Sequence, residues 1–169
     1  MKKSMRSFLL FIVCVLAGAT TFSQEIRGTY AIKNVETGML LRVKDANKKD
    51  GTPLVAYTPV NWKCMTWDFE HVEGQTYRLK NLFTGKTFQP GSTPADSVSL
   101  VQMPFGKDEL QQYEFVSAGE NRYYIRLKGT ALYLTPADKD GSTNSAIILA
   151  KKANGTLQQW TIYEQHPTM

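Results

Sequence analysis

The chain has 169 residues, of which 42% are hydrophobic and 21% are charged, and its formal charge is +5. These values are ordinary for one soluble globular domain, and they exclude a disordered chain, a collagen-like chain and a multi-pass membrane protein. A folded unit of about 150 residues buries roughly 68–70% of the surface that its unfolded chain exposes, so it can form a core without metal ions or disulfides.

The first 23 residues have the pattern of a secretory signal peptide. Three cations (Lys2, Lys3 and Arg6) precede an apolar run over 8–17, and small residues follow up to Ser23. The run is too short to cross a bilayer, which takes about 20 apolar residues. Cleavage after Ala19 or Ser23 fits the pattern, and Ser23 is preferred because polar sequence begins there. We expect residues 1–23 to be removed and the mature chain to be secreted or periplasmic, with no stable membrane insertion.

The mature chain is expected to be nearly neutral and to hold one cysteine. Loss of the three leader cations lowers the formal charge from +5 to +2. The remaining Lys and Arg residues are scattered, whereas a nucleic-acid binder usually carries a basic stripe. Cys64 stays alone once Cys14 has left with the leader, so no intramolecular disulfide can form. We therefore expect stability to come from packing, and we expect no nucleic-acid partner.

Two sequence markers recur three times in the mature chain. Tyr30, Tyr77 and Tyr123 are separated by 47 and 46 residues. An aromatic-x-apolar element follows each tyrosine after a nearly constant interval, at 67–69, 113–115 and 160–162. The shared spacing indicates three repeats, at about 26–73, 74–120 and 121–165.

Each repeat is predicted to contain four short strands. In chain order, the clearest strands are at 28–34, 54–57, 67–69, 75–81, 98–101, 113–115, 122–126, 147–150 and 160–162, and a hairpin returns after each of the turns at 37–38, 84–85 and 128–129. The third hairpin is expected to be two residues shorter, because Leu132 is matched with Leu41. No segment keeps a helical apolar period for the 11 or so residues that a helix needs.

These elements predict an all-β chain. A propeller typically needs at least four blades, so three four-stranded units favour a β-trefoil with pseudo-threefold symmetry, formed by residues 24–169 as a single domain. One unit cannot bury its apolar face alone, but three can close a barrel. The expected core consists of Tyr30, Ile32, Leu41, Trp67 and Phe69 with their equivalents.

The order of motifs resembles that of ricin-B-type β-trefoil lectins over about residues 26–165. The first repeat has Gly-x-Tyr-x-Ile-x-Asn at 28–34 and Thr-Gly-x-x-Leu at 37–41, and the third ends in Gln-x-Trp at 158–160. The last motif is altered to Gln-Gln-Tyr at 111–113 and to Met-Thr-Trp at 65–67. The resemblance implies an exported, non-catalytic carbohydrate-binding module whose partner is a glycan or glycoprotein.

In that family, a carboxylate binds sugar hydroxyls, an aromatic ring stacks on the sugar and an asparagine completes the hydrogen bonds. Carried over by position, the carboxylate falls on Arg42, Gln89 and Tyr133, the aromatic on Tyr57, Val101 and Ala150, and the asparagine on Cys64, Leu110 and Leu157. No repeat keeps the acid, and only the first keeps the aromatic ring.

The first repeat nevertheless has the richest set of sugar-binding side chains. A pyranose has an apolar face and a rim of hydroxyls, which suits an aromatic platform beside polar groups. The candidate ligand-binding residues are Asp45, Asn47, Asp50, Tyr57, Asn61 and Trp62. Trp62 lies off the core positions and is either a largely exposed stacking platform or a residue packed against Pro59 and Val60. Asp138, Asp140, Asn144 and Phe105 in the other repeats are interpreted as turn and loop residues.

The sequence gives no pattern for catalysis or for a cofactor. His71 and His166 are the only histidines, and there is neither a His/Cys cluster with zinc spacing nor a Gly-rich phosphate loop. We therefore expect no enzyme activity, no cofactor and no metal. The alternative function is that of a protein-binding β-trefoil such as a secreted protease inhibitor, with contact loops at 60–63 and 103–107, each of which combines an aromatic residue with a lysine.

Overall fold

The computed structural model describes residues 24–168, so the expected signal peptide at 1–23 lies outside the described residues. Within the described range, no helix has the length and apolar character needed to cross a membrane.

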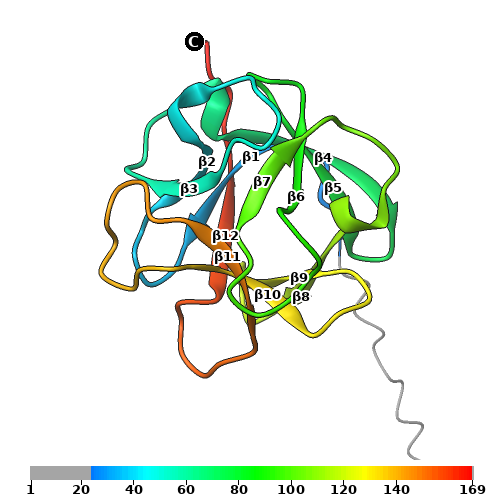
Figure 1. Ribbon diagram of the computed structural model, residues 1–169, viewed down its shortest axis with the longest axis vertical. Coiled ribbons are helices and arrows are strands. Elements are labelled where there is room, and N and C mark those ends of the chain that lie inside the picture. Colours follow the sequence, from blue (N-terminus) through cyan, green and yellow to red (C-terminus); the bar gives the residue numbers. More distant parts are fainter. Residues whose placement is uncertain (1–23, 169) are drawn as a thin grey trace, which may run out of the picture.

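The described chain is built of short strands and three turns of 3-10 helix (Figure 1). In chain order the elements are β1 (Gly28–Asn34), β2 (Leu40–Val43), η1 (Lys44–Ala46), β3 (Leu54–Tyr57), η2 (Lys63–Met65), β4 (Thr66–Glu73), β5 (Thr76–Asn81), β6 (Thr87–Pro90), β7 (Leu100–Met103), η3 (Glu109–Gln111), β8 (Tyr113–Ser117), β9 (Tyr123–Leu127), β10 (Leu132–Pro136), β11 (Ile147–Lys151) and β12 (Gln159–Glu164). The prediction of an all-β chain is confirmed.

Six of the strands close into an antiparallel barrel. Around the ring, β1 pairs with β4, β4 with β5, β5 with β8, β8 with β9, β9 with β12, and β12 again with β1. The first and last strands therefore lie side by side, as the blue and red ribbons of Figure 1 show. Closure leaves these six strands without a free edge, which removes the sites where exposed strands pair with other chains.

The remaining strands form the hairpins β2–β3, β6–β7 and β10–β11. Their second strands, β3, β7 and β11, contact one another. Inward-facing residues of all three hairpins belong to the same buried cluster as the barrel residues, so barrel and hairpins share one core.

The core contains most of the expected residues. Ile32, Leu41 and Trp67 are fully buried, and Phe69 is almost so. Tyr30 was expected in the core as well, but it is only half-buried and packs against its rim. Its hydroxyl donates a hydrogen bond to the carbonyl of Arg27, which keeps the polar end of the side chain at the surface.

One hydrogen bond recurs in all three parts of the fold and shows which positions correspond. The indole N–H of Trp67 donates to the carbonyl of Leu41, and that of Trp160 donates to Leu134, both at 3.1 Å. The hydroxyl of Tyr113 makes the same bond to the carbonyl of Phe88. Leu134, and not Leu132, is thus the equivalent of Leu41.

The expectation of a shorter third hairpin is therefore wrong. Nine residues separate Ile125 from Leu134, as they separate Ile32 from Leu41. Leu132 takes the place of Met39, since both are half-buried and pack against the edge of the core. The sequence alone could not distinguish the two leucines, because both lie in an apolar strand two residues apart.

Candidate functional site

A second, smaller apolar cluster lies beside the main core and is built from the first part of the chain. Its buried members are Ala31, Leu40, Cys64 and Met65, and it is flanked by the partly buried Ala46, Tyr57, Val60 and Trp62. The short η1 and η2 turns after β2 and before β4 bring these residues together.

A hollow of about 260 Å³ opens beside this cluster. It is lined by Arg42, Ala46, Trp62, Lys63, Cys64 and Phe83, and we call it the Arg42 hollow. Phe83 comes from the turn between β5 and β6, so two separate parts of the chain form the walls. Ligand pockets for drug-sized molecules usually measure roughly 300–1,000 Å³, so a hollow of this size suits one small group such as a single sugar residue.

Arg42, like Lys63, is a charged residue that lines the hollow. The residue is only 8% exposed, and its Nε has no hydrogen-bond partner. Its guanidinium carbon lies 4.0 Å from the centre of the Tyr57 ring and 6.0 Å from that of Trp62. Aromatic faces attract a cation at such distances. Two aromatic rings therefore hold this guanidinium. No acid within the described chain pairs with it.

Trp62 forms one wall of the same hollow. Its ring centre lies 6.4 Å from that of Tyr57, with the two rings tilted by 33°. The backbone of Trp62 is fixed by three hydrogen bonds: its N–H donates to the Val60 carbonyl, and its carbonyl accepts from the Met65 N–H and from the Thr66 hydroxyl. Trp62 is half-buried, because its ring packs on the small cluster. The ring is therefore not the largely exposed platform of the first alternative.

Tyr57 does not offer the free face that was expected of a stacking platform. The guanidinium of Arg42 lies over its ring. Tyr57 does not line the hollow, whose aromatic residues are Trp62 and Phe83.

The polar residues predicted for the site are only partly brought together. The Asn47 side chain accepts a hydrogen bond from the N–H of Lys49 and so stabilises its own turn. The Asp50 carboxylate pairs with the ammonium of Lys86. Asp45 is exposed in η1, next to the wall residue Ala46, and has a positive φ of 54°.

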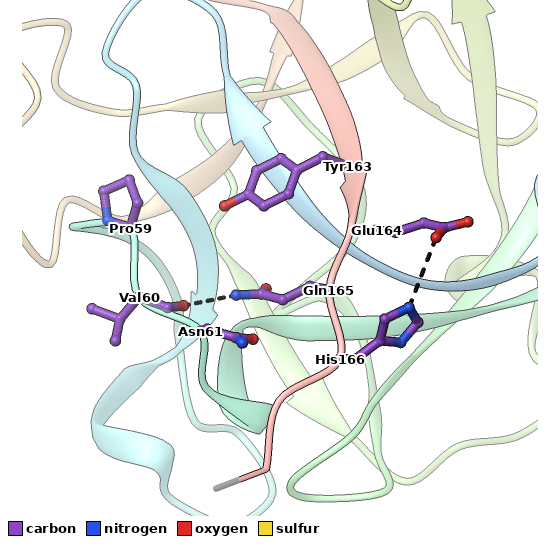
Figure 2. Close-up of a pocket in the computed structure, with 7 residues that line it drawn as sticks. All are labelled: Pro59, Val60, Asn61, Tyr163, Glu164, Gln165 and His166. Atoms are coloured by element: carbon purple, nitrogen blue, oxygen red, sulfur yellow. Dashed lines mark hydrogen bonds and ion pairs between the residues drawn. The ribbon is translucent and has the colours of Figure 1, made fainter.

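Asn61 faces a different hollow, which is shown in Figure 2 and measures about 310 Å³. Its lining residues are Pro59, Val60, Asn61, Tyr163, Glu164, Gln165 and His166. The Gln165 amide donates to the Val60 carbonyl at 3.0 Å, and His166 lies 3.7 Å from Glu164. Segment 60–62 therefore lines both hollows, with Asn61 on the C-terminal side and Trp62 on the Arg42 side.

The positions carried over from the resemblance need two corrections. Since Leu134 is the equivalent of Leu41, the residue that matches Arg42 in the third part is Thr135 and not Tyr133. Tyr57 pairs with Leu40, and the matching pair is Met103 with Thr87, so Met103 and not Val101 matches Tyr57. Gln89 keeps its assignment, since it follows Phe88 as Arg42 follows Leu41.

The candidates outside the first repeat have other contacts. The Asp138 carboxyl accepts hydrogen bonds from the Ser142 hydroxyl and from the Asp140 N–H, which lower its pKa below the ordinary value. Phe105 is half-buried, and the ammonium of Lys80 lies 5.7 Å from its ring centre. These contacts agree with turn and loop roles. Across residues 24–168, no group of three or more His, Cys, Asp and Glu is placed to hold a metal ion.

The sequence did not indicate two residues of the hollow, Arg42 and Phe83. Arg42 had been noted only as the place where an acid is missing. One signal was available, because Arg42 interrupts the apolar strand Leu40–Val43, all four residues of which are buried. Phe83 had no signal, because its proximity to Arg42 arises only when two turns 40 residues apart come together.

The sequence matches the model of the family described as ricin-type β-trefoil lectin domain-like, over residues 20–103 and 63–150. The chain belongs to this family. No curated protein matches the sequence. Solved structures that resemble the chain include the following three.

The Rhizoctonia solani agglutinin aligns with a TM-score of 0.76 and 19% identity, over 85% of this chain and 99% of its own. The Macrolepiota procera ricin B-like lectin, solved with lactose, aligns with a TM-score of 0.69 and 23% identity, over 83% and 97%. ThreeFoil, a designed protein with threefold symmetry, aligns with a TM-score of 0.77 and 20% identity, over 80% and 98%. At these identities the likeness shows the β-trefoil fold alone.

Proposed function

We propose that this protein is an exported, non-catalytic carbohydrate-binding module that binds a glycan in the Arg42 hollow of its first repeat. Family membership supports a lectin-type role. Two structural neighbours were solved with sugars, the Macrolepiota procera lectin with lactose and the earthworm R-type lectin C-half with GalNAc. The observation that carries the proposal is the hollow itself, in which Trp62 and Phe83 stand beside the cationic Arg42 and Lys63.

The chemistry of the hollow matches a sugar ring. The apolar face of a pyranose can lie on the Trp62 ring, since such contacts bury carbon-bound hydrogens against an aromatic surface. Arg42 and Lys63 are hydrogen-bond donors that accept nothing, so sugar hydroxyls would act as acceptors toward them. Asp45, beside the Ala46 wall, is the predicted residue best placed to accept hydrogen bonds in return.

The finer features of the proposal rest on the sequence pattern and on recurring contacts. Three four-stranded repeats related by pseudo-threefold symmetry are supported by the three hairpins and by the hydrogen bond that Trp67, Tyr113 and Trp160 each make. Export rests on the leader pattern, and sequencing the N-terminus of protein recovered from outside the cytoplasm tests it. The protease-inhibitor alternative stays a prediction, tested against a panel of secreted proteases.

A glycan array followed by calorimetry on residues 24–169 tests glycan binding. Trp62→Ala should weaken the binding of any glycan found by about 1–3 kcal/mol, the scale of losing one aromatic contact. The matched control is Tyr163→Ala, which removes a ring that is 41% exposed and lines the other hollow. No glycan bound at millimolar concentration, or equal losses in both variants, would contradict the proposed site.

Thermal melts must accompany the binding measurements. Trp62 is half-buried, so Trp62→Ala should cost about 1–2 kcal/mol of stability, a fraction of the value for a fully buried large side chain. Trp67→Ala removes a fully buried ring and should cost roughly 3–5 kcal/mol. Should both variants melt equally early, Trp62 is a core residue and the hollow loses its platform.

A further inference from the structure

Building on the proposed function, we propose that the Arg42 hollow selects sugars that carry a negatively charged oxyanion, either a carboxylate or a sulfate ester, over their neutral counterparts. The feature behind this proposal is that Arg42 is buried, charged and without an anionic partner in the described chain, while it lines an open hollow.

A buried guanidinium without a counter-ion is unusual. Burying a charge costs free energy unless the charge is paired, and other arginines of this protein obey that rule. Arg78 pairs with Glu70 and Arg126 pairs with Glu114. The Arg42 side chain makes neither a hydrogen bond nor an ion pair within residues 24–168, although Arg42 is buried whereas Arg78 and Arg126 are only partly buried. The missing partner is supplied if the ligand itself brings an anion.

The guanidinium is held in place before any ligand binds. Its central carbon lies 4.0 Å from the centre of the Tyr57 ring and 6.0 Å from that of the half-buried Trp62, so contacts with two rings restrict its movement. Guanidinium groups bind carboxylates and other oxyanions through two parallel hydrogen bonds, and restricted movement lowers the entropy lost in forming them. Tyr57 is accordingly a positioning residue, and Arg42 is the group that contacts the anion.

The surroundings of the hollow favour an anion as well. Lys63 lines it directly, and the ammonium of Lys48 lies 4.8 Å from the ring centre of the wall residue Phe83. Of the two carboxylates in the adjoining 45–50 loop, Asp50 is already neutralised by Lys86. Asp45 is thus the one carboxylate of this loop that no lysine neutralises, and the three cations Arg42, Lys63 and Lys48 surround the hollow. The net charge around the hollow is therefore positive.

The corresponding positions in the other two hairpins lack this feature. Gln89 is uncharged, and its side-chain oxygen accepts a hydrogen bond from Gln111. Thr135 is buried, and its hydroxyl donates to the carbonyl of Pro136. A preference for charged sugars would therefore belong to the first repeat alone, and one substitution should remove it.

The test compares matched pairs of sugars by calorimetry on residues 24–169. Methyl glucuronide against methyl glucoside probes a carboxylate, and galactose 6-sulfate against galactose probes a sulfate ester. Sodium acetate and sodium sulfate, each without a sugar, serve as probes for the anion alone. Because hydrogen bonds to charged groups contribute about twice as much as neutral ones, we expect at least one charged sugar to bind about tenfold more tightly than its neutral partner.

Arg42→Gln should lower the affinity for the charged sugar more than the affinity for the neutral sugar, and so reduce the preference to within about twofold, because the substitution removes the charge-assisted bonds. Lys44→Gln is the matched control, since it removes the same charge from an exposed residue outside the hollow and should keep the preference. Thermal melts of both variants show whether each is folded, and a folded Arg42→Lys variant, which keeps the charge without the planar fork, should give an intermediate preference.

Each result decides the matter. Neutral sugars bound as tightly as charged ones, or a preference that survives Arg42→Gln, would overturn this proposal and leave the proposed function standing. Acetate or sulfate bound as tightly as the charged sugars would make the hollow an ion site and would overturn it too. No binding of any sugar, charged or neutral, would overturn the proposed function itself.

Discussion

At the scale of single residues, Tyr113 shows how burial changes the chemistry of a side chain. It is fully buried where the other two parts of the fold have tryptophans, and its ring centre lies 4.6 Å from that of Phe88. Its hydroxyl donates to the Phe88 carbonyl at 3.1 Å. Burial raises the pKa of the Tyr113 phenol well above its ordinary value of 10.0, because the phenolate would lose its hydration.

This raised pKa predicts that the protein loses stability in alkali. Above about pH 10 the unfolded tyrosine releases its proton while the folded one keeps it, so the folded state binds more protons and the free energy of unfolding falls by up to about 1.4 kcal/mol per pH unit for this one group. Below pH 10 the contribution is fully present. Urea unfolding at a series of pH values measures the slope.

Tyr113→Phe isolates the contribution of this residue. The variant should lose about 1 kcal/mol at neutral pH with the hydrogen bond to Phe88, yet show a shallower decline in alkali. Burial also raises the pKa of Tyr77, so part of the decline should remain. An unchanged slope in the variant would show that Tyr113 ionises as readily in the folded state as in the unfolded one.

Sequence reasoning at this scale found the residues whose role follows from pattern. Ile32, Leu41 and Trp67 recur at fixed spacing, and repetition of an apolar residue indicates burial. The state of Arg42 could not be found in this way, because its burial depends on Tyr57 and Trp62 folding over it. Trp62 itself was left with two alternatives, and its half-buried ring packs on the small cluster while it also lines the hollow.

At the scale of elements, the loops before β4, β8 and β12 are each held by the side-chain hydrogen bonds of a glutamine, which comes from two different places in the sequence. Before β8, the Gln111 amide donates to the Pro104 carbonyl, and its oxygen accepts from the Gly106 N–H. Before β12, Gln158 makes the same pair of bonds with Lys151 and Ala153. These glutamines are the first residues of the Gln-x-Trp motif and of its altered copy, and they explain why the motif supports the fold.

The loop before β4 lacks that glutamine, since Met65 stands there and is fully buried. A residue from the other end of the chain replaces it. The amide of Gln165 donates to the Val60 carbonyl at 3.0 Å, as Figure 2 shows, and its oxygen lies 3.1 Å from the Thr66 hydroxyl, whose one proton it shares with the Trp62 carbonyl. The backbone N–H of Gln165 also donates to the Thr29 carbonyl. The tail after β12 thus fastens the segment that carries Trp62.

Gln165→Ala should therefore loosen residues 59–66 without disturbing the rest of the fold. Loss of these two side-chain hydrogen bonds, one buried and one partly buried, should cost about 1–3 kcal/mol, and amide exchange should become faster in that segment. His166→Ala is the control, because it changes an exposed neighbour that lines the same hollow. Equal exchange in the two variants would mean that the small apolar cluster holds the segment by itself.

The sequence predicted the strands better than it predicted these glutamine hydrogen bonds. Strand positions follow from apolar alternation and from turn residues, and the structure has a strand at each predicted place. The error in the third hairpin came from choosing between two leucines without knowing which carbonyl Trp160 contacts. The function of Gln165 has no local signal, because its partners lie about 100 residues earlier in the chain.

At the scale of the whole molecule, the barrel is closed by the pairing of its first and last strands. The register joins Tyr30 to Glu164 at one end and Asn34 to Trp160 at the other. The core that this closure completes draws residues from every strand pair of the barrel and from all three hairpins. No third of the chain can therefore bury its apolar residues by itself.

This arrangement predicts that residues 24–169 unfold as one cooperative unit. Repeats that were stable by themselves would unfold in separate transitions. With a shared core, unfolding of one repeat exposes the apolar residues of the others, so all three unfold together. Calorimetry should give one transition whose measured enthalpy equals the van't Hoff enthalpy. Trp67→Ala and Trp160→Ala lie in the first and last parts of the chain, and each removes a fully buried ring that is bonded to a hairpin carbonyl. Each should cost roughly 3–5 kcal/mol and shift the whole transition downward without splitting it. A melt that separates into two steps in either variant would show that the part left intact folds on its own, and the single-domain prediction would then be wrong.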